Sequence, residues 1–428
     1  MTQPRRRTSS SKAVPEFRGS SIPWTRNLRG PTGRLFGDPA PSPDERSFQV
    51  DNTSDDYYKS PYYAQHAKQV LAIPVGPPKA PLNLQDVLGA DFLAPIIAGK
   101  KIAFHSVGDT GASSTGAIPN EAAVADAMAA DLAGMTADAP AFLFHLGDVI
   151  YNFGEAEYYY DQFYEPFRDY DRPIFAIPGN HDGEVTYLHG GTEPDVPSLQ
   201  AFIANFCTSE PTKPQDSGAL VRTTMTQPGV YFTLDAPFVS IVGIYTNVLE
   251  GPGVLTDSSG HYPALKSDQQ FDWLVGELKR LAPQRQAGER AVLLACHHPP
   301  ASADKTHGGT TGLADDLDQA FAAGGLWPDA ILSGHAHIYQ RFARNVNGKQ
   351  LPYVVAGSGG HDARVPPGEK AGEAPRTWGD YTLAVGPVAE YGYLTVTVDM
   401  RDSNARTLTI AFTAPAQPAA ADQVVVAL

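Results

Sequence analysis

Two short apolar runs in the middle of the chain each stop near a glycine that is followed at once by polar side chains. Residues 141–146 are followed by Gly147-Asp148, and residues 173–177 by Pro178-Gly179-Asn180-His181-Asp182. Residues 155–170, which are polar and aromatic and which we expect to be helical, separate the two runs. A strand, a crossover and a second strand place both strand ends in the crevice where α/β proteins bind ligands.

Three further predicted strands end in a similar way. Residues 101–107 precede Gly108-Asp109, residues 291–296 precede His297-His298, and residues 330–333 precede Gly334-His335-Ala336-His337. Alternate residues of an extended chain point the same way, so the last two imidazoles are expected to face one site. Carboxylate, amide oxygen and imidazole together suit Zn, Mn and Fe. Each strand end alone has an ordinary interpretation as a turn or a packed histidine, but five together predict a metal site.

Length and composition allow a large globular protein. The chain has 428 residues, of which 42% are hydrophobic and 18% charged, enough for one large domain or two. Cys207 and Cys296 do not have the spacing of a zinc site and cannot build a disulfide framework. No apolar run approaches the roughly 18 residues of a membrane span.

The N-terminal segment is basic on an acidic protein. The net charge is −15, yet the first 34 residues hold eight basic residues and one acid. Such an arm can contact nucleic acid or lipid, but we favour a solvated tail or a segment lying on the acidic body, and expect neither a nucleic-acid nor a membrane partner. No apolar stretch follows Arg5-Arg6-Arg7, so a cytoplasmic protein is expected. Secretion or a periplasmic location is the alternative if a signal has been trimmed.

Two regions are predicted. Residues 1–97 are rich in Pro, Ser and Gly, which indicates an irregular N-terminal arm packed on the body, and residues 98–428 form the main domain. Early strands in that domain alternate with helices, and late strands come in pairs, which indicates an α/β fold with mixed sheets. The expected helices cover about residues 120–134, 195–206, 267–281 and 313–323, and the later strands 230–234, 238–244, 351–356, 393–400 and 407–412.

The ordered strand ends resemble the five motifs of calcineurin-like metallophosphoesterases over roughly residues 101–412. The matching motifs are Gly108-Asp109-x-Gly111, Gly147-Asp148-x-x-Tyr151, Gly179-Asn180-His181-Asp182, Leu294-x-x-His297 and Gly334-His335-x-His337. The chain is most similar to the purple acid phosphatase branch, because its first motif lacks Asp-x-His, its second ends in Tyr, and its last continues to Tyr339-x-Arg341. The resemblance implies a four-layer α-β-β-α sandwich, with residues 98–428 as the catalytic domain.

The resemblance also implies a centre of two metal ions and its ligands. It assigns Asp109, Tyr151 and His337 to the first ion, Asn180, His297 and His335 to the second, and Asp148 to a bridge between them. A tyrosine ligand favours Fe3+ in the first position, because a phenol with a pKa near 10 has to lose its proton. The second ion would be Fe2+, Zn2+ or Mn2+.

Three further side chains receive roles by the same resemblance. His181 would steady the transferring phosphoryl group, with Asp182 orienting its imidazole. His307, ten residues after His297 in a loop flanked by glycines, would contact the substrate and protonate the leaving group. The alternative for His307 is an ordinary surface histidine. His145, His189 and His298 are expected to be structural or to lie at the rim.

The implied activity is hydrolysis of phosphomonoesters, of the acid phosphatase type, by in-line attack of a metal-activated hydroxide on a phosphorylated small molecule. Phosphodiesterase or nucleotidase activity on the same fold is the nearest alternative. A non-catalytic binding protein that keeps the fold is a further alternative, which the presence of all seven ligand types disfavours. Plant purple acid phosphatases are secreted and carry a fibronectin-like N-terminal domain that residues 1–97 do not resemble, so the pH optimum, compartment and substrate stay open.

Overall fold

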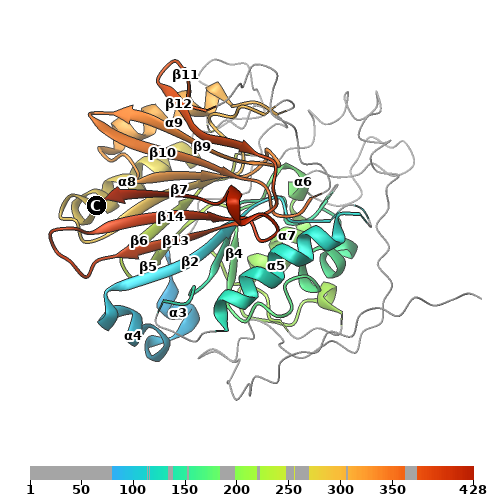
Figure 1. Ribbon diagram of the computed structural model, residues 1–428. Helices are drawn as coiled ribbons and strands as arrows, with labels where there is room; N and C mark the ends of the chain where they lie inside the picture. Colours follow the sequence, from blue (N-terminus) through green and yellow to red (C-terminus); the bar gives the residue numbers. More distant parts are fainter. Residues whose placement is uncertain are drawn as a thin grey trace, which may run out of the picture.

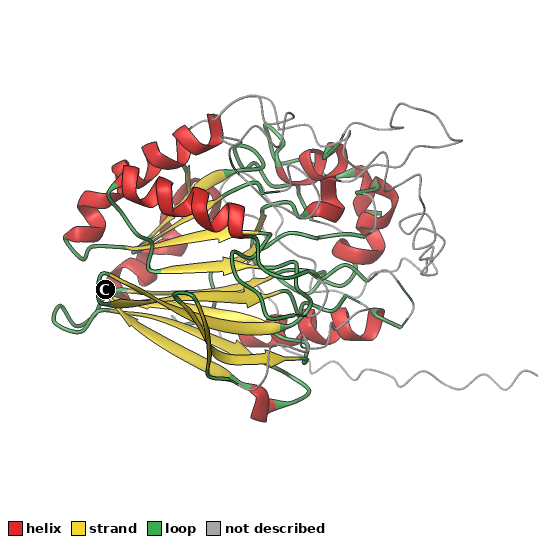
Figure 2. Cartoon of the chain, turned by 90° about the horizontal axis from the view of Figure 1, so that it is seen from above, coloured by secondary structure: helices red, strands yellow, loops and turns green. Residues whose placement is uncertain are grey.

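The chain folds into two β-sheets that face each other, with helices on their outer sides (Figure 1, Figure 2). This computed structural model describes residues 80–112, 114, 116–133, 138–151, 154–183, 198–218, 222–246, 255, 269–304, 307–361 and 374–428. The α/β class with two mixed sheets, expected from the sequence, is confirmed. No helix in this part of the chain combines the length and the apolar character that crossing a membrane requires.

The larger sheet has nine strands and mixed pairing. Its order is β1 (Leu82–Asn83), β5 (Phe232–Ala236), β6 (Val239–Gly243), β7 (Ala291–Cys296), β8 (Ala330–Ser333), β10 (Lys349–Ala356), β9 (Tyr339–Val346), β12 (Tyr381–Val388) and β11 (Arg376–Trp378). The central strands β6, β7, β8 and β10 are parallel, so their carboxyl ends meet at one edge.

The smaller sheet has six strands, again mixed. Its order is β15 (Asp422–Ala427), β14 (Thr407–Thr413), β13 (Tyr393–Asp399), β2 (Lys101–Val107), β3 (Leu143–His145) and β4 (Ile174–Ala176). β2, β3 and β4 are parallel, whereas β13, β14 and β15 form an antiparallel meander joined to β2.

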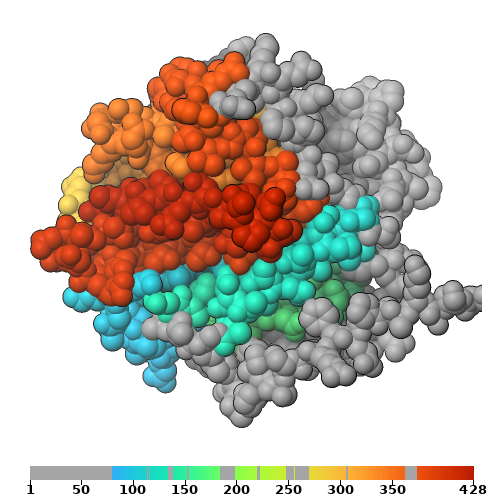
Figure 3. Space-filling model, viewed as in Figure 1, coloured from blue at the N-terminus to red at the C-terminus, as the bar shows by residue number. Residues whose placement is uncertain are grey.

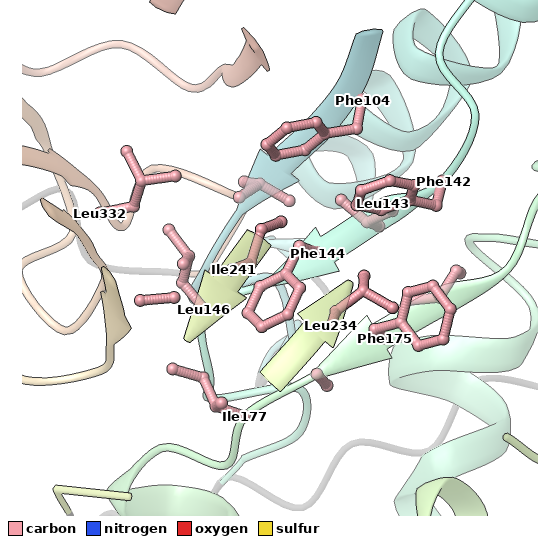
Figure 4. Packing of buried hydrophobic residues seen from close by; sticks show 14 of the residues in the cluster. Phe104, Phe142, Leu143, Phe144, Leu146, Phe175, Ile177, Leu234, Ile241 and Leu332 are labelled. Carbon is pink, nitrogen blue, oxygen red and sulfur yellow. The ribbon is translucent and has the colours of Figure 1, made fainter. Parts of the chain in front are cut away.

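The space between the sheets is filled by apolar side chains from both. Phe144 of the smaller sheet lies against Leu234 and Ile241 of the larger one (Figure 4), and its ring centroid is 6.0 Å from that of Phe232. Successive residues of β7 point to opposite faces of the larger sheet. Leu293 therefore belongs to this core between the sheets, whereas its neighbours Val292 and Leu294 pack on the outer face. The fully apolar sequence of β7 therefore reflects burial on both faces.

Helices α8 (Gln269–Gln286) and α9 (Thr311–Gly324) pack on the outer face of the larger sheet. Their apolar side chains and those of the sheet form a second hydrophobic core, separate from the one between the sheets. On the other side of the sandwich, α5 (Ile118–Leu132) lies against the smaller sheet. The carboxylate of its Asp131 accepts a hydrogen bond from the Tyr393 hydroxyl at 2.7 Å and lies 3.2 Å from Nε2 of His105. The meander beyond β2 presents threonines and a 54% exposed Val425 on its outer face. Among the described residues, the outer helix layer therefore covers only part of the smaller sheet.

The remaining helical segments are short. They are α3 (Leu84–Leu88), α4 (Ala90–Gly99), α6 (Asn180–Gly183), α7 (Gln200–Phe206), the 3₁₀ segments η2 (Ala156–Tyr158), η5 (Gln215–Ser217) and η6 (Pro418–Ala420), and the π segment η3 (Tyr160–Tyr164). The continuous helix expected over residues 155–170 is thus replaced by η2, η3 and turns. The helix expected from residue 195 begins at Gln200, with residues 195–197 outside the described part.

The N-terminal region differs from the expectation where the structure describes it. Residues 1–79 lie outside the described part, but residues 82–97 are not irregular: they hold β1, α3 and most of α4. The Asn83 side chain caps α3 by accepting a hydrogen bond from the Gln85 amide at 2.9 Å. Helices this short show little periodicity, and Pro95 lies within α4, so composition alone concealed them.

The last strand is attached to the other sheet by a carboxylate. Strand β15 lies on the surface of the molecule (dark red in Figure 3). Its largely buried Asp422 accepts hydrogen bonds from the Tyr339 hydroxyl and from Nε of Arg341, both at 2.6 Å. The Tyr339 ring stacks on Phe412 with centroids 4.0 Å apart. The Tyr-x-Arg extension of the last motif thus joins β9 to β15 across the sandwich.

We expect Asp422→Ala to lower the free energy of unfolding by about 1–3 kcal/mol, because it leaves two donors without their acceptor in a largely buried place. Urea denaturation followed by circular dichroism measures this. The matched control is Gln423→Ala, on the exposed outer face of the same strand, for which we expect a change within about 0.5 kcal/mol. Equal effects of the two substitutions would contradict the assignment.

Candidate functional site

The loops that follow β2, β3, β4, β7 and β8 meet at the carboxyl ends of the parallel strands. Hydrogen bonds connect them directly: the Asp109 amide donates to the Gly147 carbonyl at 2.9 Å, and the Gly334 amide to the His297 carbonyl at 3.0 Å. The His335 amide donates to Oδ2 of Asp109 at 2.8 Å and so joins the two sheets. The site is therefore built from both halves of the sandwich.

Two groups of donor side chains lie side by side and share one carboxylate. Asp109, Asp148 and His337 offer ligand atoms within 4.8 Å of one another, and so do Asp148, His297 and His335. All five side chains are at most 9% exposed. We call these the first and the second donor group. Asp148 belongs to both, which is the position that the sequence predicts for a bridging ligand.

Tyr151 completes the first donor group. Its hydroxyl donates towards Oδ2 of Asp148 at 2.9 Å and Oδ1 of Asp109 at 3.1 Å, and lies 3.2 Å from Nε2 of His337. The backbone holds the phenol here, because the Gln162 side chain accepts from the Tyr151 amide and donates to its carbonyl, at 2.7 and 2.8 Å.

Asn180 completes the second donor group. Its Oδ1 lies 3.0 Å from both Nε2 of His297 and Nδ1 of His335. Nδ1 of His297 faces the Leu146 carbonyl at 2.9 Å, and since a carbonyl only accepts, this nitrogen carries the proton. Such a contact fixes the ring and leaves Nε2 directed at the shared Asp148, whose Oδ2 is 3.4 Å away.

Three of these residues have left-handed backbone conformations. Asp109 has φ 58°, Asp148 has φ 52° and His335 has φ 70°, and each directly follows a glycine at the end of a strand. Non-glycine residues adopt this region rarely, and such strain gathers at functional sites. The turn at His335 also corrects the expectation of an extended His-x-His: His335 reaches the second donor group and His337 the first.

The glycines before the donors are required for space. A Cβ on Gly179 would lie 2.5 Å from the Asp148 amide nitrogen and 2.6 Å from Cε1 of His297. A Cβ on Gly334 would lie 2.6 Å from Oδ2 of Asp109. Backbone therefore approaches both donor groups closely, in a way that any larger residue would block.

The charges of the site fit a metal cation. Burial raises the pKa of Asp109 well above its usual value, and nearby Asp148 adds to this. Burial alone would raise the pKa of Asp148 too, but the His297 and His181 imidazoles outweigh it and hold that pKa well below its usual range. The two buried carboxylates thus ionise together only with a positive charge beside them, which a metal ion would supply.

The imidazoles and the phenol differ in how burial and the carboxylates shift their pKa values. Burial and the neighbouring histidines lower the pKa of His335 and of His337 well below the usual value, which keeps both rings neutral, as metal ligands must be. Burial opposes a charge on His297, but Asp148 raises its pKa to about 9. Burial, Asp109 and Asp148 raise the pKa of Tyr151 well above 10, so only a strongly acidic metal ion would ionise it.

His181 and His307, which received roles from the sequence, both lie at the site. The His181 amide donates to Oδ1 of Asp148 at 2.9 Å, and its ring contacts Tyr151. Nδ1 of His307 lies 3.1 Å from Oδ2 of Asp304, and its ring lies 4.6 Å from that of His335, so this loop histidine reaches the site.

The Asp182 carboxylate binds the backbone of two loops. It accepts hydrogen bonds from the amides of Gly179 at 2.8 Å, Val149 at 3.1 Å and Ile150 at 3.3 Å. It ties the loop after β4 to the loop after β3 and so fixes the backbone around Asp148. Position next to His181 in the sequence did not reveal this.

Two histidines at the site were not predicted to act there. His361, after the glycine run that ends β10, stacks on Tyr151 with centroids 3.6 Å apart. The sequence offers a signal for His361, since the other loops of the site are also marked by an apolar strand followed by glycine and a donor.

His298 is fully buried, with Nδ1 2.9 Å from the Thr246 hydroxyl and its ring centroid 4.5 Å from that of His335. His145 lies 3.0 Å from the Thr110 hydroxyl, and His189 lies outside the described residues.

A family model described as calcineurin-like phosphoesterase matches residues 106–339. The chain belongs to this family. The match spans the strand ends that supply the two donor groups, and the family implies a centre of two metal ions at that place. No curated protein matches the sequence.

Solved structures are similar to this chain at low identity. GAP50, the anchor in the inner membrane complex of Plasmodium, is 11% identical, with a TM-score of 0.52 over 77% of this chain and 89% of that one. A dimetal phosphatase from Danio rerio is 12% identical, with a TM-score of 0.41 over 76% and 98% of the two chains.

We expect Gly179→Ala to remove bound metal and reduce phosphatase turnover at least about tenfold, because its Cβ displaces Asp148 and His297. Elemental analysis of the purified protein and a colorimetric phosphatase assay measure both effects. The matched control is Gly276→Ala on the exposed side of α8, where an added Cβ meets nothing within 4 Å. It should retain full metal content and gain up to about 1 kcal/mol of stability. Full metal content in Gly179→Ala would contradict this picture of the site.

Proposed function

We propose that the protein is a phosphatase that hydrolyses phosphomonoesters of small molecules at a centre of two metal ions. The observation that carries the proposal is the pair of buried donor groups that share Asp148. Seven side chains would hold the ions, namely Asp109, Tyr151 and His337 for the first, Asn180, His297 and His335 for the second, and Asp148 for both.

Two ions held by these side chains would activate water as a nucleophile at neutral pH and would stabilise the charge of the transition state. Protein groups then have to position the phosphoryl group and protonate the leaving oxygen. No nucleophilic serine or cysteine is needed.

His181 is our candidate for contacting the phosphoryl group. The hydrogen bond from its amide to Asp148 and the contact between its ring and Tyr151, with centroids 4.3 Å apart, place its side chain beside the first donor group. An imidazole in this position can donate a hydrogen bond to a phosphate oxygen.

His307 is our candidate for the general acid. Its ring centroid lies 4.6 Å from that of His335 and 5.2 Å from that of His337, so His307 lies close to one histidine of each donor group. The amide of His307 and its Nδ1–H both face the Asp304 carboxylate, which leaves Nε2 for proton transfer. The side chain is 19% exposed, as a group that meets an entering substrate must be.

Tyr151 supports placement in the purple acid phosphatase branch. The phenol lies within 3.2 Å of three donor atoms of the first donor group. Since burial beside two carboxylates opposes its ionisation, we assign Fe3+ to the first position, and Fe2+, Zn2+ or Mn2+ to the second.

We expect purified protein to hydrolyse p-nitrophenyl phosphate, and Asp148→Asn or His335→Ala to lower kcat/KM at least about 100-fold, because each removes a ligand. Asp402→Asn, in the exposed turn before β14, is the control and should behave as wild type. Elemental analysis of the same samples identifies the ions. If bis(p-nitrophenyl) phosphate is hydrolysed faster than p-nitrophenyl phosphate, the protein is a diesterase. Metal-loaded protein that hydrolyses neither ester would refute the proposal.

The role of His307 predicts a dependence on the leaving group. We expect His307→Ala to lower kcat for an alkyl phosphate such as glycerol phosphate by about 10²–10⁴. Turnover of p-nitrophenyl phosphate should fall far less, because nitrophenolate leaves without protonation. Steady-state kinetics on the two substrates measures the difference, and an equal loss on both would contradict the assignment.

A further inference from the structure

The glycine run after β10 forms a short ladder with the loop after β2. The Gly108 amide donates to the Ala356 carbonyl at 3.0 Å, and the Gly359 amide donates back to the Gly108 carbonyl at 3.1 Å. A Cβ on Gly357 would lie 2.7 Å from Oδ2 of Asp109, so the run passes directly over a proposed ligand. A sixth strand end thus enters the site, and it carries no residue among the seven proposed ligands.

His361 ends this ladder and reaches the first donor group in three ways. Its amide donates to the Asp109 carbonyl at 3.1 Å. Its ring stacks on Tyr151, with centroids 3.6 Å apart and planes 16° apart. Its ring also meets His337 edge to face, with centroids 4.7 Å apart. It therefore contacts each of the three proposed ligands that belong to the first ion alone.

A hydrogen bond to the backbone fixes the orientation of the His361 ring. Its Nδ1 lies 3.0 Å from the Gly111 carbonyl, and because a carbonyl only accepts, Nδ1 carries the proton. This hydrogen bond ties the ring to the same loop that supplies Asp109. A ring locked at both its backbone and its side chain restricts the phenol that lies against it.

We propose that His361 is a positioning residue that holds Tyr151, His337 and Asp109 in place for the first metal ion. The inference rests on the proposed function, since it assigns a supporting residue to one half of that metal centre. It gives His361 no contact with the ion. Residues that orient ligands change metal affinity by about 10–100-fold when they are removed. Here the effect should fall on one ion of the two.

Titration of the metal-free full-length protein with Zn2+, followed by calorimetry, tests this. We expect wild type to bind two ions and His337→Ala to lose the first. His361→Ala should bind the second ion as wild type does and the first about 10–100-fold more weakly. His361→Phe keeps a ring on Tyr151 but loses the hydrogen bond to Gly111, so its affinity for the first ion should be intermediate.

A double variant separates positioning from a general loss of structure. In His337→Ala the first ion is already lost, so adding His361→Ala should leave the remaining binding event unchanged. With Fe3+ in the first position, the visible absorption band of the Tyr151 phenolate should shift in His361→Ala.

Two results would overturn the inference with the proposed function intact: wild-type affinity for both ions in His361→Ala, or equal weakening of both. A wild-type protein that takes up two ions neither from Zn2+ alone nor from Fe3+ followed by Zn2+ would instead refute the proposed metal centre, and the inference with it.

Discussion

The sharing of the Asp148 carboxylate between two donor groups is the interaction on which the rest of the site depends. A carboxylate buried this deeply is stable only with positive or hydrogen-bonding partners on every side. The structure supplies them from three loops: the His181 amide, the Tyr151 hydroxyl and the His297 imidazole. The strained backbone at Asp148 and the three amides that bind Asp182 hold this side chain in one orientation.

The two-sheet architecture brings these loops together. Three come from parallel strands of the smaller sheet and three from parallel strands of the larger one, so neither sheet alone holds a complete donor group. The contact of the His335 amide with Asp109 and the ladder between residues 108 and 359 join the two sets at the site. Shortly after His337 in the chain, Arg341 makes a further connection between the sheets by donating to Asp422 of the edge strand β15. The sheets are thus joined both at the site and at this edge strand.

The sequence predicts the parts of this fold that carry a local signal. β2, β7 and β8 are largely apolar and are followed within two residues by a donor, and their bounds agree with those expected. β9, β12 and β15 are half-exposed, with mixed composition, and their pairing depends on partners distant in the chain, so no short window reveals them.

The same limit applies to the site. The types of the donors follow from the sequence, because burial and glycine spacing mark them locally. The way they are held does not: the left-handed turn at His335, which separates this ring from His337, and the backbone hydrogen bonds that Asp182 accepts have no local signal. His361 depends on a stacking partner 210 positions earlier, Tyr151, which only the folded chain brings near.

The spread of the site along the chain has a consequence for folding. Residues from Asp109 to His361 have to meet before either donor group is complete, and contacts of such long sequence separation form late. Local segments of an unfolded chain do not bring these side chains together, so bound metal would favour the native state. Each ion would then stabilise that state by mass action, in proportion to the logarithm of its free concentration over its dissociation constant. Metal in the surroundings would thereby add to the stability of the fold.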